Sequence, residues 1–94
     1  MIEVNEYFEG NVKSLSLAGA GGKETVGVMA PGQYIFNTGL KELMTVISGG
    51  LTVKLAQETE WNLYQVGETF EVPANSAFEL KVMVDSAYLC QFVG

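Results

Sequence analysis

The chain is a succession of short apolar runs, separated throughout by glycine, proline and other turn residues. The runs are rich in β-branched and aromatic residues, and no stretch of ten or more residues keeps the 3.6-residue period of a helix. In the run 76–84, Phe78, Leu80 and Val82 fall two apart, so they share one face of a strand. The pattern predicts an all-β sandwich or barrel with strands at 11–17, 25–30, 33–38, two in 45–56, 61–66, 69–72, 76–84 and 87–93.

Two segments lack a clear strand pattern. The glycine-rich AGAGGKE at 18–24 is expected to be a turn or flexible loop, and GLKELM at 39–44 is expected to form at most one helical turn. The Gly-Lys pair in 18–24 is not a phosphate-binding loop, because Leu17 stands where the motif needs glycine and Glu24 follows the lysine. With no repeat or linker, the 94 residues predict one domain, 1–94.

The composition excludes several kinds of catalytic site. The chain has no histidine and a single cysteine, Cys90, which rules out the usual zinc sites, two-histidine iron sites and Ser-His-Asp or Cys-His catalysis. Cys90 lies in the apolar run YLCQFV and is expected to be a small buried hydrophobe. All five basic residues are scattered lysines and the net charge is −6, so a nucleic-acid partner is not expected.

The first residues also bear on location. The segment MIEVNEYFEG has no basic residue and no long apolar stretch, unlike a signal peptide. No apolar run approaches the roughly 20 residues that cross a bilayer. We therefore expect a cytoplasmic protein without a membrane partner.

Two motifs resemble those of the cupin barrel, a jelly-roll fold. Gly67, five residues and Pro73, followed by Ser76 and Phe78, resemble the second cupin motif, with Phe78 where metal-binding cupins have histidine. Glu42, six residues and Gly49 resemble the carboxylate-to-glycine half of the first motif, whose histidines are also replaced. The resemblance implies a small single-domain cupin barrel that binds no metal.

A closer resemblance extends over nearly the whole chain, from about residue 4 to residue 92. The segments 5–14, 25–29, 31–38, 44–51, 72–80 and 88–90 are similar to the cupin-type pyrimidine/purine nucleoside phosphorylases. This resemblance implies phosphate-dependent cleavage of purine and pyrimidine nucleosides to free base and pentose 1-phosphate, with no cofactor. Its partners would be nucleosides and inorganic phosphate.

Glu42 is the first candidate for catalysis in this frame. It occupies the cupin ligand position without a metal to bind, so it would accept hydrogen bonds from ribose hydroxyls and stabilise positive charge on the sugar. The alternative is a glutamate at a strand rim that binds a loop amide.

The candidates for substrate binding begin with Tyr34, Phe36 and Thr38, which alternate along one strand and share a face. If that face points inward, it supplies an aromatic shelf and a hydroxyl to the pocket. The alternative is that the three residues are ordinary core of the barrel. Phe78 either stacks on the base or plugs the core where the metal site was lost.

Three more residues complete the expected site. Ser76 binds phosphate or sugar, or caps a turn, while Met44 and Tyr88 are expected to line the same wall as Glu42. For phosphate, the chain has no arginine to act as a bidentate clamp. Backbone amides around 48–50 are one candidate for binding phosphate, and Lys13 is the favoured lysine, although an exposed strand lysine is the alternative reading.

Other functions and the assembly state stay open at this level. A metal-free cupin that binds small sugars or nucleotides without turnover is the main alternative, and a structural dimerisation protein is a third, because a fold does not determine a function. We expect a homodimer in which the N-terminal run, with Tyr7 and Phe8, and the C-terminal run cover exposed sheet edges.

Overall fold

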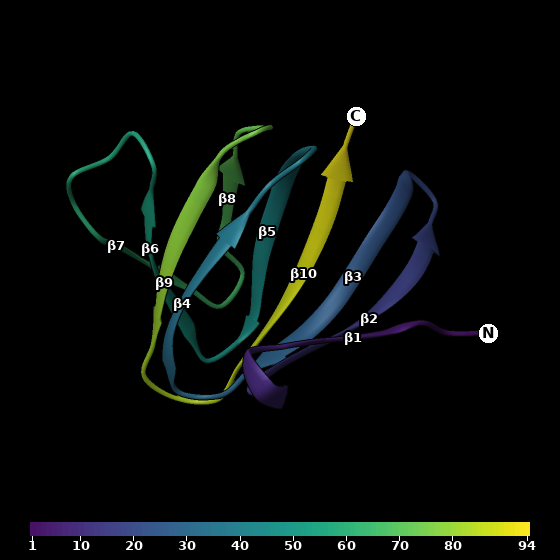
Figure 1. The fold of residues 1–94 in the computed structure, drawn as a ribbon, viewed down its shortest axis with the longest axis horizontal. Helices are drawn as coiled ribbons and strands as arrows, with labels where there is room; N and C mark the ends of the chain where they lie inside the picture. The colour runs from purple at the N-terminus through teal and green to yellow at the C-terminus, as the bar shows by residue number, and fades with distance from the viewer.

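The computed structural model describes every residue, Met1–Gly94, and its regular secondary structure is almost entirely β-strand (Figure 1). A single 3₁₀ turn, Phe8–Gly10, follows the first strand. The strands are β1 (Val4–Tyr7), β2 (Val12–Gly19), β3 (Gly22–Met29), β4 (Gly32–Asn37), β5 (Lys41–Ser48), β6 (Gly50–Leu55), β7 (Asn62–Gln65), β8 (Thr69–Val72), β9 (Ala77–Val82) and β10 (Ser86–Val93). No helix in the structure has the length and apolar character needed to span a membrane.

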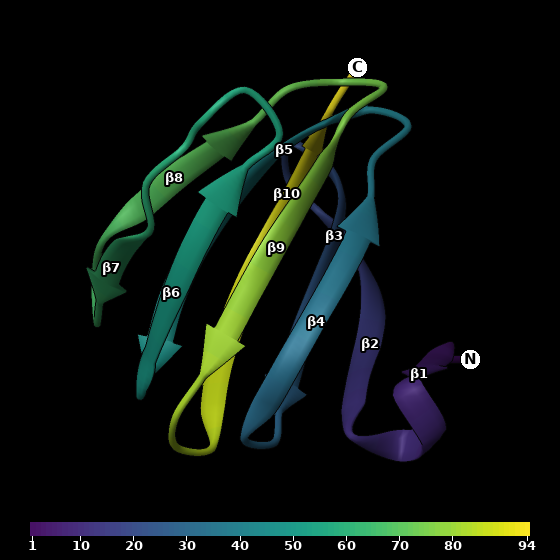
Figure 2. The same cartoon turned by 60° about the vertical axis from the view of Figure 1, so that its left-hand side comes forward.

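The strands form two antiparallel sheets that face each other. The six-stranded sheet has the order β1-β2-β3-β10-β5-β8 and the four-stranded sheet the order β4-β9-β6-β7. Figure 2 shows β4, β9 and β6 as one layer in front of β3 and β10. The expected all-β, cupin-like fold is confirmed, with one refinement: the two sheets are not hydrogen-bonded into a closed barrel and form an open sandwich.

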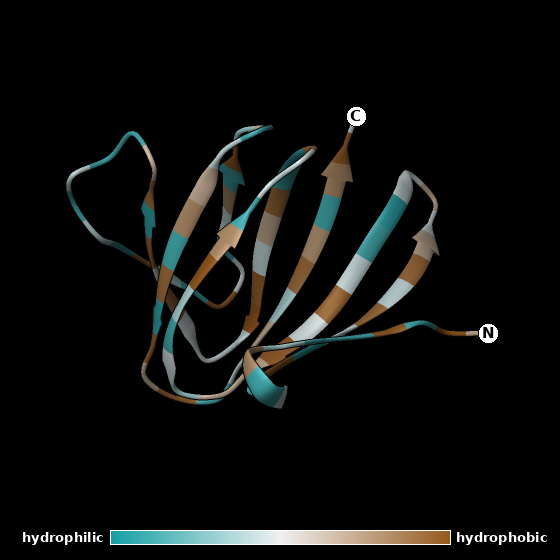
Figure 3. Ribbon diagram, in the orientation of Figure 1, coloured by the Kyte–Doolittle hydropathy of each residue, from teal (hydrophilic) through white to brown (hydrophobic).

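The core lies between the sheets because the apolar residues alternate along the strands, as the banded ribbons of Figure 3 show. On β9, Phe78, Leu80 and Val82 are all buried, as their spacing predicts, whereas Lys81 points outward. On β10, Tyr88 and Cys90 point inward in the same way. One cluster of 14 buried residues joins the two sheets.

Of the turn or flexible loop expected at 18–24, the turn is confined to Ala20 and Gly21, and the rest of the segment is strand. Strands β2 and β3 continue through it as a tight hairpin, in which Ala18 pairs with Lys23 and Gly19 with Gly22. Gly22 has a positive φ of 127°, which glycine adopts readily at such a turn. Backbone ladder bonds across the hairpin therefore outweigh the turn preference of the glycines, and Lys23 becomes a strand residue.

The segment 39–44 also differs from its expected helical turn. From Lys41 onward it is part of β5, where Glu42 pairs with Phe92 of β10 on one side and with Val72 of β8 on the other. A strand with partners on both sides satisfies its backbone groups better than a single isolated turn, because helix nucleation is costly. The consequence is that Glu42 has a defined place in the sheet.

The N-terminal strand was not predicted from its sequence pattern. β1 pairs with β2 and ends in the 3₁₀ turn, where Phe8 and Glu9 have positive φ angles of 51° and 57°. This turn brings two aromatic rings onto β4 of the same chain: Tyr7 packs edge-on against Phe36 with ring centroids 5.7 Å apart, and Phe8 lies 5.0 Å from Tyr34. One end of the sandwich is thereby covered from within the chain.

Candidate active site

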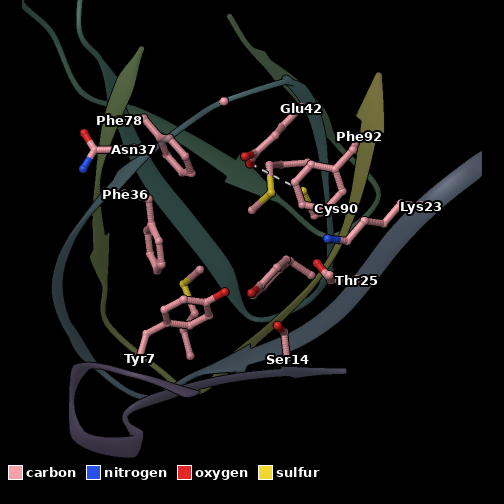
Figure 4. A pocket seen from close by; sticks show the side chains of 14 residues that line it. Tyr7, Ser14, Lys23, Thr25, Phe36, Asn37, Glu42, Phe78, Cys90 and Phe92 are labelled. Carbon is pink, nitrogen blue, oxygen red and sulfur yellow. Dashed lines mark hydrogen bonds between the residues drawn. The ribbon is translucent and has the colours of Figure 1, made fainter. Parts of the chain in front are cut away.

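A cavity of about 310 Å³ lies between the two sheets, near the end where β5 begins and β10 ends (Figure 4). Its volume is at the lower end of the range of small-molecule sites. The six-stranded sheet contributes most of the lining, and β4, β9 and the connection between β4 and β5 contribute the rest. The lining residues are Tyr7, Ser14, Lys23, Thr25, Met29, Phe36, Asn37, Gly39, Glu42, Met44, Phe78, Tyr88, Cys90 and Phe92.

One side of the cavity is aromatic. Phe36 of β4 and Phe78 of β9 are paired across the two strands and stack with their centroids 5.8 Å apart and their planes 25° apart. Phe78 is only 3% exposed and also contacts Phe70, whereas Phe36 is half-buried. Both rings line the cavity, and Phe36 offers the larger free surface to a flat ligand.

Four residues contribute hydroxyl groups to the lining of the cavity: Tyr7, Ser14, Thr25 and Tyr88. The side-chain amide of Asn5 donates a hydrogen bond to Ser14 Oγ at 3.2 Å. Because that bond occupies one acceptor site on Ser14 Oγ, the hydroxyl proton can be donated to Tyr88, the other side-chain hydrogen-bond partner of Ser14. Burial raises the pKa of Tyr88, so its phenol stays protonated and remains a donor.

Glu42 points into the cavity from β5, and Figure 4 shows its carboxylate between the aromatic side and Phe92. The thiol of Cys90 donates a hydrogen bond to Glu42 Oε1 at 3.4 Å. Burial raises the pKa of Glu42, and the hydrogen bond from Cys90 opposes part of this rise. The partner of this carboxylate is thus a neighbouring side chain on β10 and no loop amide, which leaves its remaining lone pairs available to a ligand.

Lys23 lies opposite the aromatic side, at the mouth of the cavity, and is the one cationic residue in the lining. Its ammonium group sits over the ring of Phe92, 5.3 Å from the centroid, at a distance typical of a cation–π contact. Cys90, two residues before Phe92 on β10, is buried, as expected, and burial raises the pKa of its thiol above the usual value. The thiol therefore stays neutral and acts as a donor.

The structure brings together five of the eight residues expected at the site. Glu42, Phe36, Met44, Phe78 and Tyr88 all line the cavity.

The other three expected residues lie outside the cavity lining. Tyr34 faces inward but its hydroxyl donates to the carbonyl of Ala30 at 2.6 Å. Thr38 Oγ1 donates to the carbonyl of Pro73 at 2.7 Å and accepts from the backbone amide of Ser76 at 2.9 Å. Thr38 therefore ties the turn that contains Ser76 to the end of β4.

The two phosphate-binding features considered from the sequence also lie away from the cavity. The amide of Gly50 donates to Ser86 Oγ at 3.1 Å. This turn follows the last residue of β5, roughly 20 Å along the strand from Glu42 at about 3.3 Å per residue. Lys13 is exposed, because it alternates with the buried Val12 and Ser14 on β2.

Five polar residues of the lining are absent from the set expected from the sequence: Tyr7, Ser14, Lys23, Thr25 and Asn37. Lys23 and Thr25 fall two apart, as do the other inward-facing residues of β3. This spacing does not identify Lys23 when 18–24 is taken as a loop, because only a residue in a strand can be assigned to one face of a sheet. Tyr7 and Ser14 depend on the pairing of β1 with β2.

The potential for metal binding is limited to isolated side chains. Glu42 and Cys90 are adjacent, but no group of three or more histidine, cysteine, aspartate or glutamate residues lies within reach of one ion. The chemistry available from the cavity's own residues is therefore that of a carboxylate, an ammonium group, hydroxyls and aromatic faces.

Comparison with known proteins places the chain in a family. A family model described as pyrimidine/purine nucleoside phosphorylase matches residues 2–92. A protein of Teredinibacter turnerae with that name is 56% identical over 92 residues, covering 98% of each chain. Among solved structures, a Vibrio parahaemolyticus protein of unknown function superposes with a TM-score of 0.96 at 47% identity, covering 99% of each chain.

A more distant structure supports the fold alone. An RmlC-like cupin from Shewanella frigidimarina has a TM-score of 0.74 at 15% identity and covers 97% of this chain and 82% of its own. The family resemblance read from the sequence is confirmed by the family model and the named relatives. This chain belongs to the pyrimidine/purine nucleoside phosphorylase family.

Proposed function

We propose that this protein is a nucleoside phosphorylase, which cleaves a nucleoside with inorganic phosphate to a free base and a pentose 1-phosphate. The observation that carries the proposal is the division of one cavity into an aromatic side, Phe36 and Phe78, and a polar side that holds Glu42 and several hydroxyls. A nucleoside has the same two halves, a flat base and a polyhydroxylated sugar. Its relatives of that name make the assignment specific.

Glu42 acts on the sugar in this proposal. Cleavage of the N-glycosidic bond develops positive charge on the ring oxygen and anomeric carbon, as in glycoside hydrolysis. A carboxylate at the cavity wall stabilises that charge, and it interacts with the transition state more strongly than with the neutral nucleoside. The same carboxylate accepts hydrogen bonds from ribose hydroxyls, which orients the sugar.

The aromatic side suits both purines and pyrimidines. Phenylalanine rings bind the face of a base and have no groups that read its edge, so stacking favours neither class strongly. We therefore infer that both classes are substrates. The measurement is kcat/KM for adenosine and uridine, and a difference of more than about 1,000-fold would exceed what shape and stacking alone account for.

The test of the proposal is base release from uridine or adenosine with and without inorganic phosphate. We expect free base and pentose 1-phosphate only when phosphate is present. A protein that binds nucleoside, as seen by a thermal shift, but releases no base would be a binding module instead. The matched variant is Glu42→Gln, which keeps the size of the side chain; unchanged phosphate-dependent turnover in this variant would overturn the role of Glu42.

The activity is expected to need no metal. Treatment with EDTA should leave the rate unchanged, because the polar groups proposed for catalysis all belong to the chain itself. Loss of activity in EDTA that a divalent metal restores would contradict this.

We also propose that the protein is a homodimer. The outer face of β2 and β3 exposes Leu15, Leu17, Val26 and Val28, of which Leu15 and Val26 are directly paired across the strands. A contiguous exposed apolar face of this kind is typical of an interaction surface. Size-exclusion chromatography with light scattering should give twice the chain mass of 10.2 kDa, and a single 10.2 kDa species would refute the dimer.

A further inference from the structure

The proposed reaction needs a site for an anion, and the cavity offers one cation. Phosphate is held in proteins by charge-assisted hydrogen bonds, most often from arginine or lysine. This chain has no arginine. Lys23 is the one basic residue among the lining residues of the cavity.

The other four lysines are engaged elsewhere or face outward. Lys41 and Lys54 form ion pairs with Glu71 at 3.3 Å and Glu79 at 3.2 Å. The ammonium group of Lys81 lies 4.1 Å from the ring centroid of Trp61, and Lys13 is on the outer face of β2. Lys23 has no carboxylate partner and contacts the ring of Phe92, which positions its charge without neutralising it.

The position of Lys23 also fits the direction of attack. Lys23 and Thr25 project from β3 of the six-stranded sheet, whereas Phe36 and Phe78 belong to the four-stranded sheet opposite (Figure 4). A base stacked on the aromatic side leaves the sugar in the middle of the cavity. A nucleophile bound beside Lys23 then approaches the anomeric carbon from the side away from the leaving base.

Two hydroxyl groups complete the set of donors. Thr25 lies two residues from Lys23 on the same inward face of β3. Ser14, on β2, lines the same side of the cavity, where its hydroxyl accepts a hydrogen bond from Asn5 and has Tyr88 as its other side-chain partner. One ammonium and two hydroxyls on neighbouring strands provide donors for several phosphate oxygens.

We propose that Lys23, with the hydroxyls of Thr25 and Ser14, forms the subsite for inorganic phosphate. This inference rests on the proposed nucleoside phosphorylase function. A phosphate oxygen bonds to the anomeric carbon as the bond from that carbon to the base nitrogen breaks. The electron pair of the broken bond goes to the base, which takes up a proton from phosphate or water, and the sugar leaves as its 1-phosphate.

The decisive variant is Lys23→Met, which removes the charge and keeps an apolar stem against Phe92. We expect the KM for phosphate to rise roughly 10- to 100-fold, the loss expected for one hydrogen bond to a charged group. The KM for uridine should stay within about twofold, because Lys23 lies opposite the aromatic side. Lys23→Arg, which keeps the charge, should restore most of the affinity for phosphate.

Lys13→Met is the matched control, since it removes an exposed lysine from the adjacent strand β2. Its KM for phosphate should equal that of the wild type. A KM for phosphate within twofold of the wild type in Lys23→Met, or an equal rise in Lys13→Met, overturns the subsite while the phosphorylase function stands.

A second measurement separates failure of the subsite from failure of the proposed function. Inorganic phosphate at constant ionic strength should raise the melting temperature of the wild type and of Lys13→Met, and should not raise that of Lys23→Met. If the wild type releases no base, the phosphorylase proposal fails, and this thermal shift still tests the subsite. No shift in the wild type, or an equal shift in Lys23→Met, overturns it.

Discussion

Replacement of Gly27 by alanine is expected to push the ring of Tyr88 into the cavity. Gly27 of β3 pairs directly with Tyr88 of β10, and the phenol ring of Tyr88 lies against the glycine. A Cβ atom at position 27 would stand 2.4 Å from both Cζ and Oη of Tyr88 and 2.6 Å from Cε1. Ordinary van der Waals contact begins near 3.4 Å, so the ring must move by about 1 Å.

The cost follows from where the ring can go. Tyr88 is 6% exposed and lines the cavity, so a ring pushed away from Gly27 moves into the space proposed for the sugar. Overpacking of this kind destabilises a core by about 1–3 kcal/mol, and the lower backbone entropy of alanine returns about 0.5–1 kcal/mol. The net loss in the free energy of unfolding is therefore near 1–2 kcal/mol. In a domain of this size, each kcal/mol lowers the melting temperature by about 4–8 °C.

Urea unfolding of Gly27→Ala measures this loss, and the KM for nucleoside is expected to rise in parallel. Gly21→Ala is the matched control, because a Cβ at Gly21 meets nothing within 4 Å. A double-mutant cycle with Tyr88→Leu isolates the contact, since the cost of alanine at 27 should largely vanish once the ring is gone. The reasoning is refuted if Gly27→Ala is as stable as Gly21→Ala, or if its cost is the same with leucine at 88.

Three other outcomes follow from the cavity. Because burial raises the pKa of Glu42, the folded state binds the proton more tightly than the unfolded state, and stability falls as pH rises from about 4.3 through the raised pKa. Glu42→Gln should therefore have a higher melting temperature than the wild type at pH 7 and the same melting temperature at about pH 4. A lower melting temperature of the variant at pH 7 would contradict this. The hydrogen bond from the Cys90 thiol lowers the pKa of Glu42. Cys90→Val removes this bond and keeps the site apolar, so it should move the acidic limb of the pH profile of kcat/KM to higher pH. A shift to lower pH would count against the hydrogen bond between Cys90 and Glu42. Phe78→Leu should lower the free energy of unfolding by about 1–3 kcal/mol, which is more than the loss expected for Phe36→Leu. Phe36→Leu should in turn raise the KM for nucleoside more than Phe78→Leu does. The reverse order in both measurements would make Phe78 the stacking surface and Phe36 the residue that fills the core.

Much of the fold is readable from local pattern. The alternation in 76–84 predicts correctly that Phe78, Leu80 and Val82 are buried together, because a strand's side-chain period of two depends only on the backbone. The same rule correctly places Tyr34, Phe36 and Thr38 on one face, and the structure shows that this face of β4 and its end points inward. What the pattern cannot supply is the position along the strand at which a cavity opens, and only Phe36 of these three lines it.

The all-β class, the absence of imidazole chemistry and, through the resemblance, the family can all be read from the residues alone. Tertiary structure decided the site. Glu42 and Cys90 are separated by 48 positions and meet only because β5 and β10 pair in one register. Lys23 faces the cavity only because β2 and β3 stay paired up to the turn at Ala20 and Gly21. The physical reason is that composition and period set which face of a strand is apolar, whereas the meeting of charged groups depends on hydrogen-bond registers between strands far apart in the chain.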